Sequence, residues 1–221
     1  VPRCTRPQEY FPGDKTVSES TDPPANWFTR EDESADEHFY AEARFVTHID
    51  QATIFALTDY YRQFLANADA IIDLMSSWVS HYPEELAAHI VTGLGMNEDE
   101  LAHNRQFTHW TVQNLNHAPV LPFASETYDR ATIAVSIQYL TQPLAVMAEV
   151  RRVLKPGGKI CIAMSHRLFP TKAISAFVKL PPEERVRLVL FYLTESGFSE
   201  VEFSDQSPNG FDPLWIVSGR A

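Results

Sequence analysis

Polar side chains follow two apolar segments of this chain, at places where strands are expected to end. Residues 165–167 read Ser-His-Arg and residues 136–139 read Ser-Ile-Gln-Tyr, each after a run of apolar residues. Polar groups at the carboxyl ends of strands in an α/β sheet commonly face the ligand. We therefore expect His166 to act as a general base, Tyr139 to be a second catalytic candidate, and Arg167 to contact the substrate.

A second group of candidates lies nearer the N-terminus. Tyr40, Arg44 and His48 are spaced four residues apart, so a helix would place them on one face. We expect His48 to be a further catalytic candidate, and Tyr40 and Arg44 to contact the substrate or cover the site. His81 is expected to face the same cleft. The alternative for these residues is packing or surface ion pairing.

The elements that position these residues are clearest in the second half of the chain. The segment 143–154 places four apolar side chains on one helical face: Leu144, Met147, Val150 and Leu154. The sequence Pro156-Gly157-Gly158 cannot continue a helix, and apolar segments predicted to be strands stand on both sides. Two such strands joined by a helix predict a right-handed parallel crossover.

Further segments of strand and helix character extend this pattern. The predicted strands are residues 69–75, 89–94, a short stretch within 107–115, 131–137, 159–165, 198–203 and 213–218. The predicted helices are residues 50–66 with Asp50 as N-cap, a turn and helix over 76–88, a short helix after Asn97, residues 143–154 and residues 182–196. We therefore predict an α/β fold with a mostly parallel seven-stranded sheet, whose last two strands form an antiparallel hairpin.

Composition limits the kinds of partner. The chain of 221 residues is 44% hydrophobic and 21% charged, which suits a single globular domain over residues 31–221. The net charge of −11 argues against nucleic acid as a partner, and no apolar run approaches ~18 residues, so no membrane span is expected. Residues 1–30, rich in Pro, Ser, Thr and acids, are predicted to be a flexible lead. Cys4 and Cys161 are not expected to pair, which fits a reducing intracellular compartment, cytoplasmic or organellar.

Three motifs in the second half of the chain have the order and spacing of a known family. They are Leu121-Pro122-Phe123, the acid Asp129 before the fourth strand, and residues 152–158, Arg-Val-Leu-Lys-Pro-Gly-Gly, before the fifth. With them the chain resembles the class I S-adenosylmethionine-dependent methyltransferases of the type 11 subgroup. The resemblance implies a Rossmann-like class I fold, S-adenosylmethionine as cofactor, a small-molecule substrate and an N-terminal helical lid over about residues 36–66.

The resemblance also implies cofactor-binding positions, beginning at the end of the first strand. The family has an acid there, followed by a glycine-rich turn and a helix whose N-terminus faces the carboxylate of the ligand. In this chain the acid is Asp73, but the turn has no glycine: Met75, Ser76, Ser77 and Trp78 stand in its place. The serine hydroxyls are expected to replace some lost contacts, and Trp78 to wall or fill the site. The alternatives are a turn held by Asp73, a helix cap made by the serines and a core position for Trp78.

The positions expected to bind the nucleoside also depart from the family pattern. Gly95 stands nearest the place of the acid that accepts the two ribose hydroxyls, and Met96 is expected beside the adenine. Asn114, followed by Leu115, stands where the family has Asp. Its carbonyl can accept a hydrogen bond from the adenine amino group, although Asn is also a common turn residue. Ser136, after the fourth strand, completes the set.

Two hypotheses for the function remain. The first is an S-adenosylmethionine-dependent methyltransferase acting on a small molecule, with weak cofactor binding that Gly95→Asp strengthens if the backbone tolerates the side chain. The second is a related protein that has lost catalysis and serves as a metabolite-binding or interaction module. The fingerprints of α/β-hydrolases, phosphate-binding loops and dinucleotide sites are absent from the sequence. No metal site is predicted, because His103, His109 and His117 are too far apart for a helical metal pair.

Overall fold

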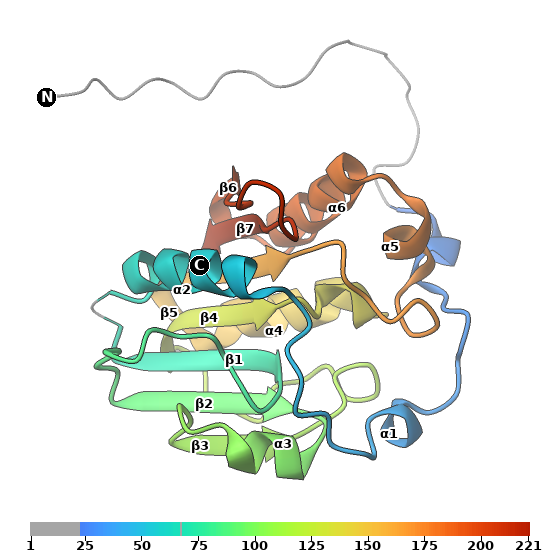
Figure 1. Ribbon diagram of the computed structural model, residues 1–221. Helices are drawn as coiled ribbons and strands as arrows, with labels where there is room; N and C mark the ends of the chain where they lie inside the picture. Colours follow the sequence, from blue (N-terminus) through green and yellow to red (C-terminus); the bar gives the residue numbers. More distant parts are fainter. Residues whose placement is uncertain (1–22, 67) are drawn as a thin grey trace, which may run out of the picture.

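The computed structural model describes residues 23–66 and 68–221, which form one seven-stranded sheet covered by helices (Figure 1). The strand order is β3-β2-β1-β4-β5-β7-β6, and β7 is antiparallel to both of its neighbours while the remaining pairs are parallel. The predicted mostly parallel sheet with a C-terminal antiparallel hairpin is confirmed. The strands are β1 (Ala70–Ser76), β2 (Ile90–Gly95), β3 (His109–Val112), β4 (Tyr128–Ala134), β5 (Leu154–Met164), β6 (Ser199–Asp205) and β7 (Trp215–Arg220).

Helix ends follow the capping residues that the sequence provides. The Asp50 side chain accepts a hydrogen bond from the Thr53 backbone N–H (2.9 Å) at the start of α2, and Asn97 accepts one from the Glu100 backbone N–H (3.0 Å) at the start of α3. Helices α4 and α6 begin with proline, whose missing N–H is not needed in the first turn. The helices are η1 (Ala25–Phe28), α1 (Asp36–Phe39), α2 (Gln51–Phe64), α3 (Glu98–His103), η2 (Ile137–Tyr139), α4 (Pro143–Val153), α5 (Ser175–Lys179) and α6 (Pro182–Glu195).

The sheet has a separate apolar core on each face. On one face, α4 and α6 pack over side chains such as Ile72 and Ile162. On the other face, α2 packs over side chains such as Ile71 and Cys161. Neighbouring positions of one strand thus serve opposite cores, as expected for strands that are buried on both faces.

The buried face of α4 differs by one position from the predicted one. Leu144, which we expected to be buried, is 38% exposed. The buried positions of this helix are Pro143, Val146, Met147, Val150 and Val153. They form a stripe at spacings of three and four residues that starts from Pro143 rather than Leu144.

The segment after β1 is irregular, although we predicted a turn and helix over residues 76–88. In the described chain, β1 ends at Ser76, β2 begins at Ile90, and no helix lies between them. Pro83 stands in the middle of this segment, where its ring and missing N–H disfavour a helix. Tyr82 is buried instead and packs edge-on against Tyr61 of α2, with ring centroids 5.2 Å apart. An irregular segment therefore covers the part of the sheet that a helix was expected to cover.

Residues 29–50, which we call the strap, run past the carboxyl ends of β1 and β2 and appear in blue in Figure 1. Within the strap, all of which the structure describes, α1 has four residues and no other helix is present. Tyr40, Arg44 and His48 therefore do not share a helical face, contrary to the prediction. Residues 40–50 pack through specific side-chain contacts rather than through an amphipathic stripe.

The N-terminal side of the strap is joined to the body of the protein. The predicted flexible lead, residues 1–30, falls largely outside the described residues, as does Cys4. From Pro23 onward the chain is described, and Trp27 and Phe28 of η1 pack against the α4–α6 core. The described part of the chain contains no helix with the length and apolarity required to cross a bilayer.

Candidate functional site

A cavity of about 290 Å³ lies at the carboxyl ends of the parallel strands, between the sheet and the strap. All but one of the side chains predicted to form the site line it. From the cofactor set these are Asp73, Met75, Ser76, Ser77, Trp78, Gly95, Met96, Asn114, Leu115 and Ser136. From the catalytic and substrate sets they are Tyr40, Arg44, His48, His81, Tyr139 and Arg167. The exception is His166.

Asp73 is a buried acid at the floor of this cavity and is 3% exposed. Its oxygens accept hydrogen bonds from the hydroxyls of Ser76 (2.5 Å) and Thr132 (2.8 Å), and the Thr132 hydroxyl is also bonded to that of Tyr82. Burial raises the pKa of Asp73 to about 6, while hydrogen bonds from Ser76, Ser80 and Thr132 act in the opposite direction. No described lysine, arginine or histidine forms an ion pair with this carboxyl, so hydroxyl groups hold it.

Three residues that line the cavity have a backbone conformation that glycine adopts more readily than other residues. Met75 (φ 54°), His81 (φ 59°) and Val135 (φ 50°) all have positive φ and all line the cavity. Glycine adopts this left-handed region freely, whereas other residues are strained there, a β-branched valine most of all. Strain of this kind is found preferentially at ligand-binding sites.

Side chains from other elements hold the irregular segment after β1. The Asn104 amide donates to the Ser77 carbonyl (3.0 Å) and to the Ser80 hydroxyl (2.9 Å). The Gln106 amide accepts from the Tyr82 N–H (3.3 Å) and donates to the Tyr82 carbonyl (3.0 Å). Because this described segment is not helical, it offers no helix N-terminus to the carboxylate of a ligand, which corrects the expectation drawn from the resemblance.

Gly95, the last residue of β2, has no room for a side chain. A Cβ atom there would lie 2.3 Å from the Ser76 carbonyl oxygen and 3.1 Å from Leu101 Cδ2. An acid cannot be placed at this position without displacing β1, so the condition that we set for a benefit of Gly95→Asp, a backbone that tolerates the side chain, is not met. The neighbouring Asn97 cannot take over, because its side-chain oxygen caps α3 and its amide donates to the Tyr40 carbonyl (2.9 Å).

Asn114 combines a turn role with a place in the cavity wall. Its amide donates to Glu37 Oε1 (2.8 Å), and its side-chain oxygen accepts from the Asn116 backbone N–H (2.9 Å). An amide oxygen has two lone pairs, so one acceptor site remains for a ligand. The turn alternative for this residue and its predicted contact with the ligand are thus compatible.

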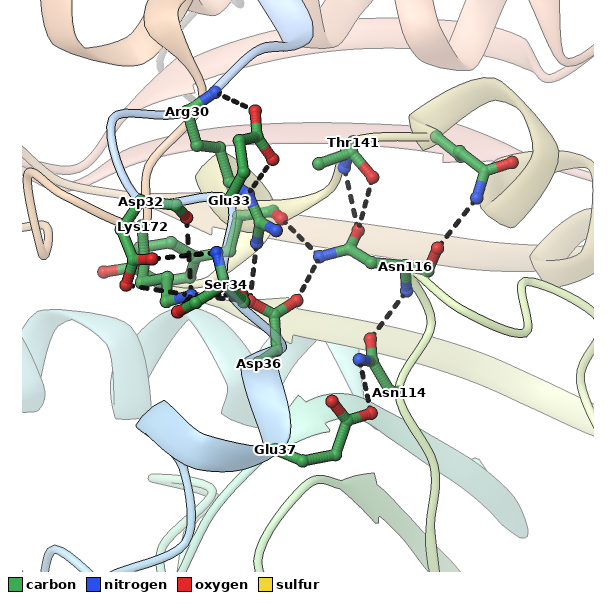
Figure 2. A network of polar contacts seen from close by, with 12 residues as sticks. Arg30, Asp32, Glu33, Ser34, Asp36, Glu37, Asn114, Asn116, Thr141 and Lys172 are labelled. Carbon is green, nitrogen blue, oxygen red and sulfur yellow. Dashed lines mark hydrogen bonds and ion pairs between the residues drawn. The ribbon is translucent and has the colours of Figure 1, made fainter.

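A buried cluster of charged side chains fixes the strap beside the cavity (Figure 2). Lys172 is fully buried and forms ion pairs with Asp32 (3.1 Å) and Asp36 (3.4 Å). Asp36 also pairs with Arg30 (2.6 Å) and accepts from the Asn116 amide (3.0 Å). Our sequence analysis did not predict this cluster, because Lys172 and Asp32 lie 140 positions apart. The one feature of the sequence that could have indicated a buried Lys172 is its position directly before the apolar pair Ala173-Ile174.

Glu100 and Trp78 hold the middle of the strap. The Glu100 carboxylate accepts from the Arg44 backbone N–H (2.6 Å) and from the Ser77 hydroxyl (2.5 Å). The Trp78 indole N–H donates to the Val46 carbonyl (3.0 Å). Trp78 is therefore a wall of the cavity, one of its predicted roles, whereas Glu100 was not predicted as a site residue.

His166 lies outside the cavity lining, which argues against its predicted role as general base. Its Nε2 atom lies 3.1 Å from Asp212 Oδ1, and its side chain is 50% exposed. Arg167 does line the cavity, but its Nε atom also donates to Asp212 (2.9 Å to Oδ2). Asp212, in the connection between β6 and β7, thus contacts both side chains, and His166 lies beside it rather than in the cavity.

Two other histidines line the cavity, and their surroundings favour the neutral form. Burial lowers the pKa of His81 to about 4, with a further contribution from the nearby His48. Burial is also the main cause that lowers the pKa of His48. Both imidazoles are therefore neutral, and the low pKa of His81 makes it a weak proton acceptor. The Tyr139 hydroxyl accepts from the Phe169 N–H (2.8 Å), which leaves its own proton for donation.

The Ser136 hydroxyl has no hydrogen-bond partner among the described residues. The residue is 8% exposed and lines the cavity directly after the strained Val135. A buried hydroxyl without a partner costs about 1–3 kcal/mol. This atom is therefore suited to bind a ligand that enters the cavity.

Comparison with known proteins agrees with this geometry. Residues 76–162 match the type 11 family model described as a methyltransferase domain. The demethylmenaquinone methyltransferase of Staphylococcus haemolyticus is 32% identical over 100 residues, 43% of this chain and 42% of that protein. The enzyme of the same name from Corynebacterium urealyticum is 29% identical over 120 residues, 48% of this chain and 50% of that protein. The chain thus matches half or less of the length of these relatives.

Solved structures share the fold at low sequence identity. An S-adenosylmethionine-dependent methyltransferase from Archaeoglobus fulgidus is 13% identical, with a TM-score of 0.58 over 78% of this chain and 95% of that one. One from Mesorhizobium loti is 18% identical, with a TM-score of 0.55 over 75% of this chain and 98% of that one. The cyclase SpnF is 15% identical, with a TM-score of 0.53 over 74% of this chain and 80% of that one. The class I fold predicted from the sequence motifs is confirmed, and the predicted type 11 resemblance agrees with the family match over residues 76–162.

Proposed function

We propose that this chain, a type 11 methyltransferase-domain protein with the class I fold, binds S-adenosylmethionine in its cavity and methylates a small molecule. The observation that carries the proposal is the convergence of the cofactor positions on one cavity. They come from four places, Asp73 on β1, Gly95 on β2, Asn114 after β3 and Ser136 after β4, and they line the same space.

The residues of the cavity suit this cofactor without reproducing every contact of the family. Met96 and Leu115 offer apolar surface and Asn114 a free acceptor site to an adenine ring, and the unpartnered Ser136 hydroxyl offers a polar contact. No carboxylate replaces the ribose acceptor at Gly95. Loss of charge-assisted hydrogen bonds costs about 1.5–3 kcal/mol, so we expect weaker binding than in relatives with the complete motif.

The chemistry of the bound cofactor is an electrophilic methyl group on a sulfonium. Methyl transfer needs mainly alignment of the nucleophile and exclusion of water, to which the strap and Trp78 contribute by closing one side of the cavity. His48 takes the proton-accepting role that we had assigned to His166, for an acceptor whose nucleophile carries a proton, whereas the low pKa of His81 suits it to contact the acceptor as a neutral ring. Tyr139 donates a hydrogen bond to the acceptor.

Aromatic side chains support a planar ring as the acceptor. Tyr40, Tyr139 and Phe169 line the same cavity, and the rings of Tyr139 and Phe169 stack with centroids 5.9 Å apart. Planar ligands gain both apolar burial and ring contacts against such walls. The two curated relatives described above are named for demethylmenaquinone, a naming that is in keeping with a small-molecule acceptor.

The alternative function, a metabolite-binding module without catalysis, is favoured by two features of the described chain. No helix follows β1, and β2 ends in a glycine whose side-chain space is filled by the backbone of β1. The same fold also occurs in SpnF, which is described as a cyclase, so the fold alone does not imply methyl transfer.

Calorimetric titration of the chain with S-adenosylmethionine and S-adenosylhomocysteine tests the proposal. We expect Kd values in the micromolar to millimolar range, and about three- to tenfold weaker binding for Ser136→Ala because one hydrogen bond is lost. The matched control is Ser125→Ala, an exposed serine outside the cavity. Absence of heat and of a thermal shift at millimolar concentrations of both ligands would overturn cofactor binding and favour the non-catalytic module.

Catalysis is tested separately from binding. Formation of S-adenosylhomocysteine is followed while phenolic and quinol compounds are offered as acceptors. Turnover that falls in His48→Gln more than in His81→Gln, with cofactor affinity retained, supports the proton-accepting role of His48. Binding without turnover of any acceptor supports the module.

A further inference from the structure

We propose that Arg44 of the strap is the carboxylate receptor of the cavity and binds the amino-acid carboxylate of S-adenosylmethionine. In the family that this chain resembles, a helix N-terminus after the first strand faces that group. Here the described segment after β1 is not helical, and a cation from a different element stands beside the cavity instead. This inference rests on the proposed function.

Three arginines line the cavity, and they differ in how their charge is balanced. Arg30 forms ion pairs with Asp36 (2.6 Å) and Glu33 (3.4 Å), and Arg167 forms one with Asp212 (2.9 Å). Arg44 has no carboxylate partner among the described residues. Its guanidinium makes one hydrogen bond, from a terminal nitrogen to the Phe39 carbonyl (2.6 Å). Most of its donors are therefore available to a ligand.

Glu100, the carboxylate that binds the strap at Arg44, has its two oxygens engaged by other groups. Glu100 binds the backbone N–H of Arg44 and the hydroxyl of Ser77, so it fixes the main chain without neutralising the guanidinium. Aromatic rings surround that guanidinium instead: its central carbon lies 4.6 Å from the ring centre of Phe39 and 5.8 Å from that of Phe169. A guanidinium stacked on rings keeps its edge free for bidentate contact with a carboxylate.

The negative charge of Asp73 disfavours the carboxylate of S-adenosylmethionine beside the end of β1, where the family binds it. Asp73 is buried at the end of β1, and the Ser76 hydroxyl is committed to it. A second carboxylate beside this acid would be repelled. The cation on the strap is the favourable partner in the same cavity, and His48 and His81, which also line the cavity, are neutral because of their burial.

The test compares S-adenosylmethionine with decarboxylated S-adenosylmethionine, which differs from it by this carboxylate. Binding to wild type, Arg44→Gln and Arg44→Lys is measured by calorimetry at fixed ionic strength. We expect Arg44→Gln to weaken S-adenosylmethionine by about 10- to 100-fold and to leave the decarboxylated compound within about twofold. Arg44→Lys should lose less, because it keeps the charge but not the forked geometry.

The control variant is Arg105→Gln, which removes the same charge from an exposed position outside the cavity and should leave both ligands unchanged. Thermal midpoints of all variants confirm that they fold. Equal weakening of both ligands, or no weakening of either, in folded Arg44→Gln overturns the inference while the proposed function stands. If neither ligand binds the wild type, cofactor binding itself fails, and this inference fails with it.

Discussion

Two connections between neighbouring parallel strands do the same topological task in this molecule by different means. Between β4 and β5 the chain forms α4, an 11-residue helix whose backbone groups satisfy one another and whose apolar stripe packs on the sheet. Between β1 and β2 the described chain is irregular, and side chains of Asn104 and Gln106 satisfy its polar backbone groups.

The difference shows what each connection depends on. The α4 connection is specified locally, by proline at its start and a proline-glycine stop after it. The β1–β2 connection depends on partners from other elements and has positive φ at Met75 and His81. Stability and ligand binding should therefore be sensitive to single polar or glycine positions around the β1–β2 connection, and tolerant of exposed changes in α4.

The largest expected effect is at the junction of β1 and β2. Gly95→Asp should lower the free energy of unfolding by about 3 kcal/mol or more, because its Cβ would lie 2.3 Å from the Ser76 carbonyl oxygen. Urea denaturation measures the loss. Gly210→Asp is the control, since a Cβ there meets no atom within 4 Å and only a positive φ opposes it. If Gly95→Asp lowered the free energy of unfolding no more than Gly210→Asp, the end of β1 would be able to move aside at little cost.

The second effect depends on pH. The pKa of Asp73 is raised from 3.8 to about 6 in the folded chain, so its stabilising contribution is complete below pH 3.8 and is lost as pH rises through about 6. Asp73→Asn lacks this loss, and its stability relative to wild type should rise by up to about 3 kcal/mol between pH 4 and pH 8. His81 acts in the opposite direction, because its pKa falls from 6.5 to about 4, but it is common to both proteins.

The measurement for Asp73 is chemical denaturation of both proteins across this pH range. The hydroxyls of Ser76 and Thr132 can reorient toward an amide, so the variant is expected to fold. A difference between the two proteins that stays constant with pH would mean that water or a ligand solvates the carboxylate.

The third effect separates the two connections directly. Asn104→Ala should cost about 2 kcal/mol, because the Ser77 carbonyl and the buried Ser80 hydroxyl both lose their donor. Arg151→Ala, at an exposed position of α4, should change stability by no more than about 0.5 kcal/mol. Thermal and urea unfolding of the two variants give the comparison. Equal costs would contradict the dependence of the β1–β2 connection on distant side chains.

The smallest expected effect is that glycine and alanine should rank in opposite order of stability at two positions, Met75 and Ala148. At Met75, with φ of 54°, glycine should be more stable than alanine by about 1 kcal/mol, because alanine is strained in this region. At Ala148, an exposed position of α4, glycine should be less stable than alanine by about 0.5–1 kcal/mol. Differential scanning calorimetry resolves both. If Met75→Ala were more stable than Met75→Gly, the positive φ at this position would relax in solution.

The sequence was sufficient where bonding is local. The caps at Asp50 and Asn97, the start of α4 at Pro143 and the C-terminal hairpin follow from short-range rules, and the structure confirms them. The missing helix after β1 had a local signal in Pro83, which disfavours a helix, whereas Ser76 and Ser77 resemble a helix cap. The offset face of α4 is a one-residue error of the kind that periodicity alone permits.

The site was predictable in its positions but not in its bonding. Family positions such as Asp73 and Ser136 line the cavity because the carboxyl ends of parallel strands meet at one edge. The partners that hold the strap could not be inferred, since Arg44 and Glu100 are 56 positions apart and Asp50 and Asp212 are 162 apart. Contacts at such separations depend on the completed fold, which local pattern does not specify.

The long-range contacts of the strap also determine the order in which its two ends can be fixed during translation. The strap leaves the ribosome before any of the seven strands, yet the Lys172 that pairs with Asp32 follows it by 140 positions, and the Asp212 that binds Asp50 follows by 162. Translation proceeds from the N-terminus, so a nascent chain can assemble the first strands while contacts to Trp78, Asn97 and Glu100 hold the middle of the strap. The two ends of the strap meet Lys172 and Asp212 only after these residues have been synthesised, so the wall that the strap gives the cavity is completed late in translation.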